Sequence, residues 1–334
     1  MSNSIREIDD YDVDRLFEQV VSQPDPVVLR GIASRWPLVE QARTSSNDAD
    51  RYLRDFYEGA TVHAFISDSD IGGRIFYTDD LASHNFTRIS TQMDRVLDKL
   101  QEYRDTGSEA TLYMGSAPID LCLPGFSAEN SLPHAGIDAT VRIWIGNKTT
   151  VAAHYDAMDN IACVCAGKRR FTLFPPGQLE NLYVGPIDFT PAGQSVSLVD
   201  LDDPDLDRFP RFATALEHAQ SAELYPGDAI YVPSMWWHHV KGLDDFNILI
   251  NHWWRQCPAF MGAPYDALLH AILNIRDLPK SQRVAWRDAF DFYVFDNKEE
   301  NVRHIPEDKR GVVGKLDADT AKTIRATLRN KLNR

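Results

Sequence analysis

Two short motifs, far apart in the chain, carry the residues best suited to bind a metal ion. His154 and Asp156 are separated by one residue in the strand-like run 150–156, so their side chains project from the same face of a strand. A pair of histidines, His238 and His239, follows the strand-like run 229–232. A β-barrel that joins the two runs builds a site of two histidines and one carboxylate. Such a site leaves coordination positions open and is typical of non-haem Fe(II) oxygenases.

The same residues also have a purely structural interpretation. His154 and Asp156 could be a core histidine hydrogen-bonded to a carboxylate, and the histidine pair could pack with its aromatic neighbours at a strand end. Only one of two successive histidines can face the interior of a barrel. Strand parity does not choose between them, because Pro233 and a bulge beside it would interrupt the register. The residues alone therefore leave the third ligand open.

The composition indicates a folded protein of a reducing compartment. The 334 residues are 43% hydrophobic and 25% charged, which is enough to form a full core. A net charge of −14 disfavours nonspecific electrostatic binding to nucleic acid or anionic membranes, although the chain could still form a local basic groove. Four cysteines are too few for a disulfide scaffold, so we expect free thiols. With no apolar segment typical of a signal peptide or a membrane span, we expect a cytoplasmic protein that does not contact membranes.

The chain divides into three stretches that differ in their residue patterns. Residues 1–110 mix helical patterns with short strand-like runs and predict an α+β region, with helices over 13–21, 50–58 and 91–103. Residues 111–256 contain many short β-branched and aromatic runs separated by Gly, Pro and Asp, as in a β-sandwich or small barrel. Residues 257–334 are helical, and their last helix should begin near Asp317, a good N-cap residue.

Several motifs, in this order, resemble the cupin-like branch of the JmjC oxygenases, and in particular its asparaginyl hydroxylases. They lie within about 113–254: His154-Tyr155-Asp156, the runs 167–176 and 204–210, Pro226-Gly227-Asp228 and the run 236–239. The resemblance implies a mainly β fold, a double-stranded β-helix (jelly roll), with the α+β region packed on the barrel and a helical C-terminal region. It also implies Fe(II), with 2-oxoglutarate and O2 as cosubstrates.

The resemblance also assigns site residues. It takes His154, Asp156 and His239 as the metal ligands and implies no catalytic residue beyond them. The residues that it places at 2-oxoglutarate are Arg169, Asn160, Asn251 and Tyr113. Those expected around the metal or along the substrate groove are His238, Trp237 and Trp144.

This chain departs from the family pattern at two positions. Arg169 stands where the family has a lysine; it keeps the positive charge and offers a two-pronged fork to a carboxylate. Val151 stands where the family has a threonine, which removes a hydroxyl donor from the cosubstrate pocket, and a donor such as Tyr113 would have to replace it.

The activity implied is hydroxylation of a protein or peptide side chain, with release of succinate and CO2. Hydroxylation of an RNA base is an alternative that the acidic charge disfavours without excluding. A cupin that holds a metal only as a sensor or interaction module is another, and a non-oxidative zinc cupin a third. Apolar helical faces after Cys257, together with the family's dimer helices, predict a homodimer through the C-terminal helices.

Overall fold

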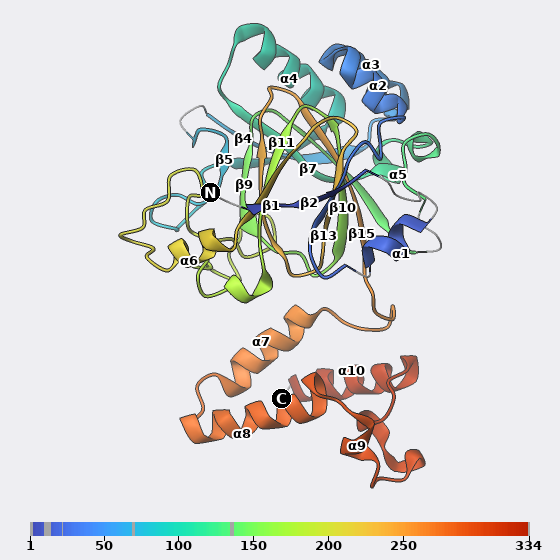
Figure 1. Ribbon diagram of the computed structural model, residues 1–334, viewed down its shortest axis with the longest axis vertical. Coiled ribbons are helices and arrows are strands. Elements are labelled where there is room, and N and C mark those ends of the chain that lie inside the picture. Colours follow the sequence, from blue (N-terminus) through green and yellow to red (C-terminus); the bar gives the residue numbers. More distant parts are fainter. Residues whose placement is uncertain (1–2, 10–14, 22, 69–70, 134–136, 333–334) are drawn as a thin grey trace. The chain divides into compact units, whose positions relative to one another are not determined.

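The computed structural model describes residues 3–9, 15–21, 23–68, 71–133 and 137–332 (Figure 1). The chain divides into two compact units, Met1–Gln256 and Cys257–Arg334.

The strands described in the first unit form two sheets. The larger sheet has the order β2-β3-β13-β10-β15-β8-β7-β4-β6. Its strands are β2 (Arg6–Ile8), β3 (Val27–Leu29), β4 (Thr61–Ser67), β6 (Thr87–Gln92), β7 (Thr111–Pro118), β8 (Thr140–Gly146), β10 (Asp159–Ala166), β13 (Ala229–Val232) and β15 (Asn247–Trp254). The smaller sheet has the order β1-β12-β11-β14-β9-β5. Its strands are β1 (Asn3–Ser4), β5 (Arg74–Ile75), β9 (Thr150–His154), β11 (Arg169–Phe174), β12 (Gln220–Leu224) and β14 (Trp237–Gly242).

The two sheets make a mainly β, jelly-roll core, as the sequence predicts. Pairing is antiparallel except for three short edge pairs, β1 with β12, β2 with β3, and β5 with β9. Strands of the N-terminal stretch, β2, β3, β4 and β6, belong to the larger sheet. Residues 1–110 therefore extend the core sheet as well as packing on it.

Helices cover the outer face of the larger sheet (Figure 1). Apolar residues of α2 (Pro37–Thr44), α3 (Ser46–Phe56) and α4 (Met93–Thr106) share one buried cluster with Ile143, Ile145, Ile248 and Ile250 of the sheet. The shorter helices are α1 (Leu16–Val21), α5 (Ile119–Cys122) and α6 (Phe212–Glu217). Because alternate residues of a strand face opposite ways, the residues between these isoleucines face the smaller sheet, where the site lies.

Helix boundaries differ modestly from the predicted ones. The helix expected at residue 50 begins at Ser46, because the Ser45 side chain accepts a hydrogen bond from the Asp48 backbone N–H and caps the helix there. The helix expected at residue 91 begins at Met93, since Thr91 and Gln92 complete β6. The first helix is described from Leu16, and the predicted start at Val13 lies outside the described residues.

The second unit is helical. Its main elements are α7 (Pro264–Ile275), α8 (Lys280–Phe290), α9 (Glu299–Val302) and α10 (Ala318–Leu332). As predicted, Asp317 caps the last helix, and its Oδ1 accepts a 2.8 Å hydrogen bond from the Thr320 backbone N–H. Among the described residues of this unit, Val302 is the one apolar side chain that is buried.

Two expectations from composition can be compared with the structure. The cysteines, Cys122, Cys163, Cys165 and Cys257, are all free thiols, as predicted. In the described part of the chain, every helix is too short or too polar to cross a lipid bilayer.

Candidate metal centre and cofactor cavity

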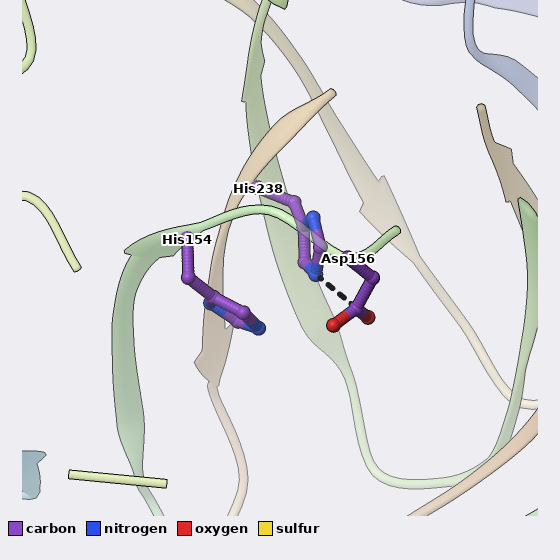
Figure 2. A group of neighbouring side chains, drawn as sticks. All are labelled: His154, Asp156 and His238. Atoms are coloured by element: carbon purple, nitrogen blue, oxygen red, sulfur yellow. Dashed lines mark ion pairs between the residues drawn. The ribbon is translucent and has the colours of Figure 1, made fainter. Parts of the chain in front are cut away.

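His154, Asp156 and His238 form a cluster that could hold a metal ion. One potential ligand atom from each residue lies within 4.8 Å of the other two. Figure 2 shows the three side chains converging, with His154 at the end of β9 and His238 on the neighbouring β14. The His238 Nε2 atom lies 3.7 Å from Asp156 Oδ2. Two imidazoles and one carboxylate on one side of a cavity match the facial arrangement of non-haem iron sites.

Backbone contacts hold the two motifs together. His154 and His238 are directly opposite each other in the β9–β14 pair, and their ring centroids are 4.2 Å apart. The Met235 N–H donates a 2.8 Å hydrogen bond to the Asp156 carbonyl oxygen, which ties the turn before β14 to the HxD motif. These contacts preorganise the cluster before any ligand arrives.

Each histidine of the cluster has its tautomer set by a backbone carbonyl. His154 Nδ1 lies 2.9 Å from the Ala152 oxygen, and His238 Nδ1 lies 3.0 Å from the Trp236 oxygen. A carbonyl oxygen only accepts hydrogen bonds, so each Nδ1 carries the proton and donates. Each Nε2 therefore offers a lone pair to the centre of the cluster, as metal-binding histidines commonly do.

The surroundings of His238 keep its imidazole neutral. Burial, and then the nearby His154, lower its pKa to about 4. A neutral imidazole has the free lone pair that metal binding requires, so His238 needs no deprotonation at neutral pH.

The prediction that His239 is the third member of this cluster is wrong. On β14, His238 and Val240 line the cavity, whereas His239 and Lys241 face the opposite side of the sheet. On that side Lys241 pairs with Asp202 at 2.7 Å. A metal at the cluster therefore meets His238, and His239 is a buried residue behind it.

Trp237 also faces away from the predicted groove. It is almost fully buried in an apolar cluster with Ala153 and Phe174, and its ring packs edge-on against Tyr155 at 4.9 Å. It therefore supports β9 and β14 from behind. Of the two places expected for Trp237, around the metal or along the substrate groove, this placement excludes the groove and fits support of the strands that carry His154 and His238.

A cavity of about 200 Å³ opens beside the cluster, between the two sheets. The larger sheet contributes Phe65, Tyr113, Trp144, Asn160, Leu249, Asn251 and Trp253 to its walls. Ser116, on β7 of the same sheet, also lines it. The smaller sheet and the loops contribute Ile75, Val151, Ala152, Phe171, Val240, Pro191, Ala192, Gln194 and Val196. The walls are mostly apolar, with a few polar groups that would fix the orientation of a small ligand.

Arg169 places a buried positive charge behind this cavity. It is 1% exposed and lies on the same face of β11 as Phe171, which lines the cavity. Burial lowers its pKa, and the hydrogen-bonded Tyr113 hydroxyl partly counters that effect. Its Nε and Nη2 atoms are buried with no hydrogen-bond partner among the described residues. A buried guanidinium in this condition is costly, and an anionic ligand is its natural complement.

The two asparagines assigned by resemblance lie side by side on neighbouring strands. Asn251 Nδ2 donates a 2.8 Å hydrogen bond to Asn160 Oδ1, and both side chains line the cavity. Asn251 Oδ1 is buried and has no partner in the described chain. The structure thus brings Tyr113, Asn160, Asn251 and Trp144 to one cavity, which His154, Asp156 and His238 also line, and Arg169 is hydrogen-bonded to Tyr113 behind it.

One residue of the centre was missed by sequence reasoning. Gln194 lies in the loop before Val196, and its Nε2 donates a 3.0 Å hydrogen bond to Asp156 Oδ1. The same loop is held in place by the Tyr77 hydroxyl, which donates a 2.6 Å hydrogen bond to the Phe189 carbonyl, and by Phe189 stacking on His84 at 4.6 Å. A lone glutamine, 38 residues from its partner, produces no recognisable pattern in a sequence.

Comparison with known proteins gives a family match over most of the chain. A family model described as a cupin-like domain matches residues 13–260. Lysine-specific demethylase JMJ31 of Arabidopsis thaliana is 24% identical over 275 residues, which are 72% of this chain and 48% of that protein. Lysine-specific demethylase 8 of Xenopus tropicalis is 26% identical over 69% of this chain and 48% of its own length.

A different kind of relative matches a shorter region. The tRNA wybutosine-synthesizing protein 5 of Mus musculus is 34% identical over 106 residues, which are 32% of this chain and 30% of that protein. The chain thus spans about half or less of the length of these curated relatives.

Proposed function

From the premise that the chain belongs to the cupin-like domain family, as its match over residues 13–260 shows, we propose that it is an Fe(II)- and 2-oxoglutarate-dependent dioxygenase. The observation that carries this proposal is the cluster of His154, Asp156 and His238 beside a cavity, together with the buried Arg169 behind it, whose Nε and Nη2 atoms have no hydrogen-bond partner among the described residues. The donor set suits Fe(II), and the buried cation suits a dicarboxylate. A cupin that only senses or scaffolds would gain nothing from burying this cation.

Each group of this chain has a defined task in the proposed reaction. His154, Asp156 and His238 would hold the iron, with Nε2 of each imidazole as the ligating atom. Arg169 would neutralise the distal carboxylate of 2-oxoglutarate, and it leaves the Tyr113 O–H free to donate to the same group, because the guanidinium donates to the Tyr113 oxygen. Iron, when bound, would let dioxygen oxidise 2-oxoglutarate and the acceptor together, so that 2-oxoglutarate becomes succinate and CO2 with one oxygen atom and the acceptor C–H becomes C–OH with the other.

The remaining cavity residues would orient the bound cosubstrate and shield it from water. Phe65, Leu249 and Val240 give the cavity dry walls, which strengthen the contact between Arg169 and a carboxylate. The Asn160–Asn251 pair presents amide groups next to the metal cluster. No protein acid or base is needed, so these residues act through position alone.

We propose a protein or peptide side chain as the acceptor. The relatives from Arabidopsis thaliana and Xenopus tropicalis, which match about 70% of this chain, are both named as lysine-specific demethylases. The unit that contains the site, Met1–Gln256, holds 21 of the 35 Lys and Arg residues but 38 of the 49 Asp and Glu residues. This negative excess repels an RNA backbone and favours a basic polypeptide. RNA is the second candidate, because another relative is named for tRNA wybutosine synthesis.

The experiment is turnover of 2-oxoglutarate by the purified full chain with Fe(II). We expect succinate, which basic peptides should stimulate, and a product peptide heavier by about 16 Da, the mass of one oxygen, or its demethylated equivalent where a methyl group is hydroxylated. His154→Ala and His238→Ala should abolish succinate formation. Stimulation by tRNA without any peptide product would reverse the choice of acceptor, and no succinate under any condition would refute the enzyme.

We also propose that the chain forms a homodimer through its C-terminal helices. Helices α7, α8 and α10 bury no residue within their unit, and Leu273, Trp286 and Phe295 are at least half exposed. Exposed apolar surface of this kind is typical of an interaction site, and the near balance of 14 basic and 11 acidic residues in this unit permits a second copy to approach. Light scattering of wild type and Leu273→Asp should give dimer and monomer masses respectively. A wild-type monomer would refute the dimer.

The free thiols fit the cytoplasm, which we propose as the compartment. Fluorescence imaging of the tagged chain tests this assignment, and a purely nuclear signal would contradict it.

A further inference from the structure

We propose that Trp144 is a specificity-determining residue of the cofactor cavity, whose indole N–H donates to the same distal carboxylate that Arg169 neutralises. This inference rests on the proposed function, since it assumes a dicarboxylate cosubstrate. It concerns a residue that sequence reasoning placed only in the general neighbourhood of the substrate groove.

The Trp144 ring is held in a fixed orientation. It stacks on the Tyr113 ring, with centroids 5.7 Å apart and planes 21° from parallel, and meets Trp253 edge-on at 6.0 Å. A Cβ atom placed on Gly115 would lie 3.2 Å from Trp144 Cζ3, so the benzene edge of the indole packs against that glycine backbone. In an indole the N–H lies on the side opposite Cζ3, so Nε1 points away from Gly115.

The Trp144 N–H has no hydrogen-bond partner in the described chain although Nε1 is buried. Of the side chains that pack around the ring, Val151, Phe65 and Leu249 are apolar, and the hydroxyl of the stacked Tyr113 is hydrogen-bonded to Arg169. A buried donor without an acceptor destabilises a fold, so one retained in a cavity wall points to an acceptor on a ligand.

The neighbours of Trp144 identify which ligand group that is. Trp144, Tyr113 and Val151 pack in one cluster, and the Tyr113 hydroxyl is hydrogen-bonded to Arg169. A carboxylate accepts about four hydrogen bonds, of which a guanidinium fork takes two. Tyr113 and Trp144 can supply the others. The Trp144 N–H would thereby replace the hydroxyl donor that is missing at the neighbouring Val151.

A direct readout is the indole N–H resonance of Trp144 in the full chain labelled with 15N-tryptophan and loaded with diamagnetic Zn(II). Trp144→Phe identifies the signal. We expect 2-oxoglutarate to shift this proton downfield, as a new hydrogen bond to an anion does. The analogue 2-oxovalerate, which ends in a methyl group, should leave it in place. Equal shifts with both ligands, or none, would overturn the proposal.

Affinity gives a second readout. By calorimetry, Trp144→Phe should weaken 2-oxoglutarate binding about tenfold, the loss expected for one hydrogen bond to a charged group, and should not change 2-oxovalerate binding. Trp253→Phe is the matched control, because its Nε1 is also buried without a partner in the described chain and it lines the same cavity, but it lies opposite Asn160 and not in the Tyr113 cluster. We therefore expect Trp253→Phe to change the binding of 2-oxoglutarate and 2-oxovalerate equally.

The outcomes separate this inference from the function it rests on. If wild type binds 2-oxoglutarate, and Trp144→Phe binds it equally well, Trp144 has no such role but the dioxygenase stands. If wild type does not bind 2-oxoglutarate with Zn(II) or without it, the proposed function itself fails, and this inference fails with it.

Discussion

Gln194 Nε2 donates a 3.0 Å hydrogen bond to Asp156 Oδ1, while Asp156 Oδ2 faces His238 Nε2 at 3.7 Å. The two carboxylate oxygens thus have different tasks: the loop holds one, and the other is directed at the metal cluster. A residue that orients a ligand in this way commonly contributes one to two orders of magnitude to metal affinity.

We therefore expect Gln194→Leu to weaken Co(II) binding by about tenfold or more, because the Asp156 carboxylate loses the donor that orients it. A titration followed by visible absorption measures the affinity. Thr190→Val is the control in the same loop, since the Thr190 hydroxyl accepts a 2.9 Å hydrogen bond from the Gly193 N–H within the loop itself. Equal affinities for Gln194→Leu and wild type would show that Asp156 needs no such support.

Arg169→Met should separate stability from function. The change replaces a buried, unpaired cation with an apolar side chain, so the ligand-free variant should melt several degrees higher than wild type. It should also lose the rise in Tm that 2-oxoglutarate gives wild type, because the carboxylate has lost its counter-charge. Thermal melts with and without 2-oxoglutarate test both. A variant that is still stabilised by the ligand would refute the role of Arg169.

His239, which faces away from the metal, makes stability depend on pH. Burial lowers its pKa to about 4 in the folded protein, against about 6.5 when unfolded. Between these values the unfolded chain binds the proton more readily, so the free energy of unfolding falls as pH falls from 6.5 to 4. His239→Gln should remove up to about 3 kcal/mol of that loss.

Urea unfolding of metal-free protein across this pH window tests the His239 prediction. His238 has the same direction of shift and is retained in both proteins, so the difference reports His239 alone. His304→Gln, in the other unit, controls for loss of a histidine as such. Identical pH slopes for His239→Gln and wild type would contradict the account.

Asp228, from the Pro-Gly-Asp turn, should matter for stability and not for the site. Its carboxylate accepts hydrogen bonds from the Gly31 and Tyr225 N–H groups, both 3.0 Å long, and pairs with Arg30 at 2.7 Å. It thus ties β3 to the turn before β13. Asp228→Ala should lower the free energy of unfolding by about 2–4 kcal/mol, since it leaves the Gly31 and Tyr225 N–H groups without this acceptor and removes one of the ion pairs of Arg30.

Denaturant unfolding measures the cost of Asp228→Ala, and Co(II) affinity is its control, which should match wild type. A loss of metal binding by a variant that is still folded would show that the turn also shapes the site.

The fold could be predicted because its signals are local or ordered along the chain. Alternation in runs such as 141–145 identifies strands, and the series of motifs identifies the jelly roll, which the structure bears out. His154 and Asp156 were found because their spacing matches the period of a strand.

The third member of the cluster could not be predicted from this period. The turn before β14 contains Met235 at φ 69°, and a register shift lies between His238 and Val240 in the pairing with β9. Which histidine faces inward is therefore decided by contacts with β9 and β11, about 65 to 85 residues earlier in the chain. The resemblance to the family assigned His239 as the third metal ligand, whereas these strand contacts place His238 in the cluster. Gln194 could not be predicted from the sequence for the same reason, because only the fold brings its loop to Asp156.

The most direct test of the account is Co(II) titration of wild type, His154→Ala, Asp156→Ala, His238→Ala and His239→Ala, followed by absorption and by binding stoichiometry. We predict that wild type and His239→Ala each bind one ion with the same spectrum. His154→Ala, Asp156→Ala and His238→Ala should lose at least a hundredfold in affinity, since each removes a ligand. Retained binding in His238→Ala with loss in His239→Ala would contradict the metal centre described here.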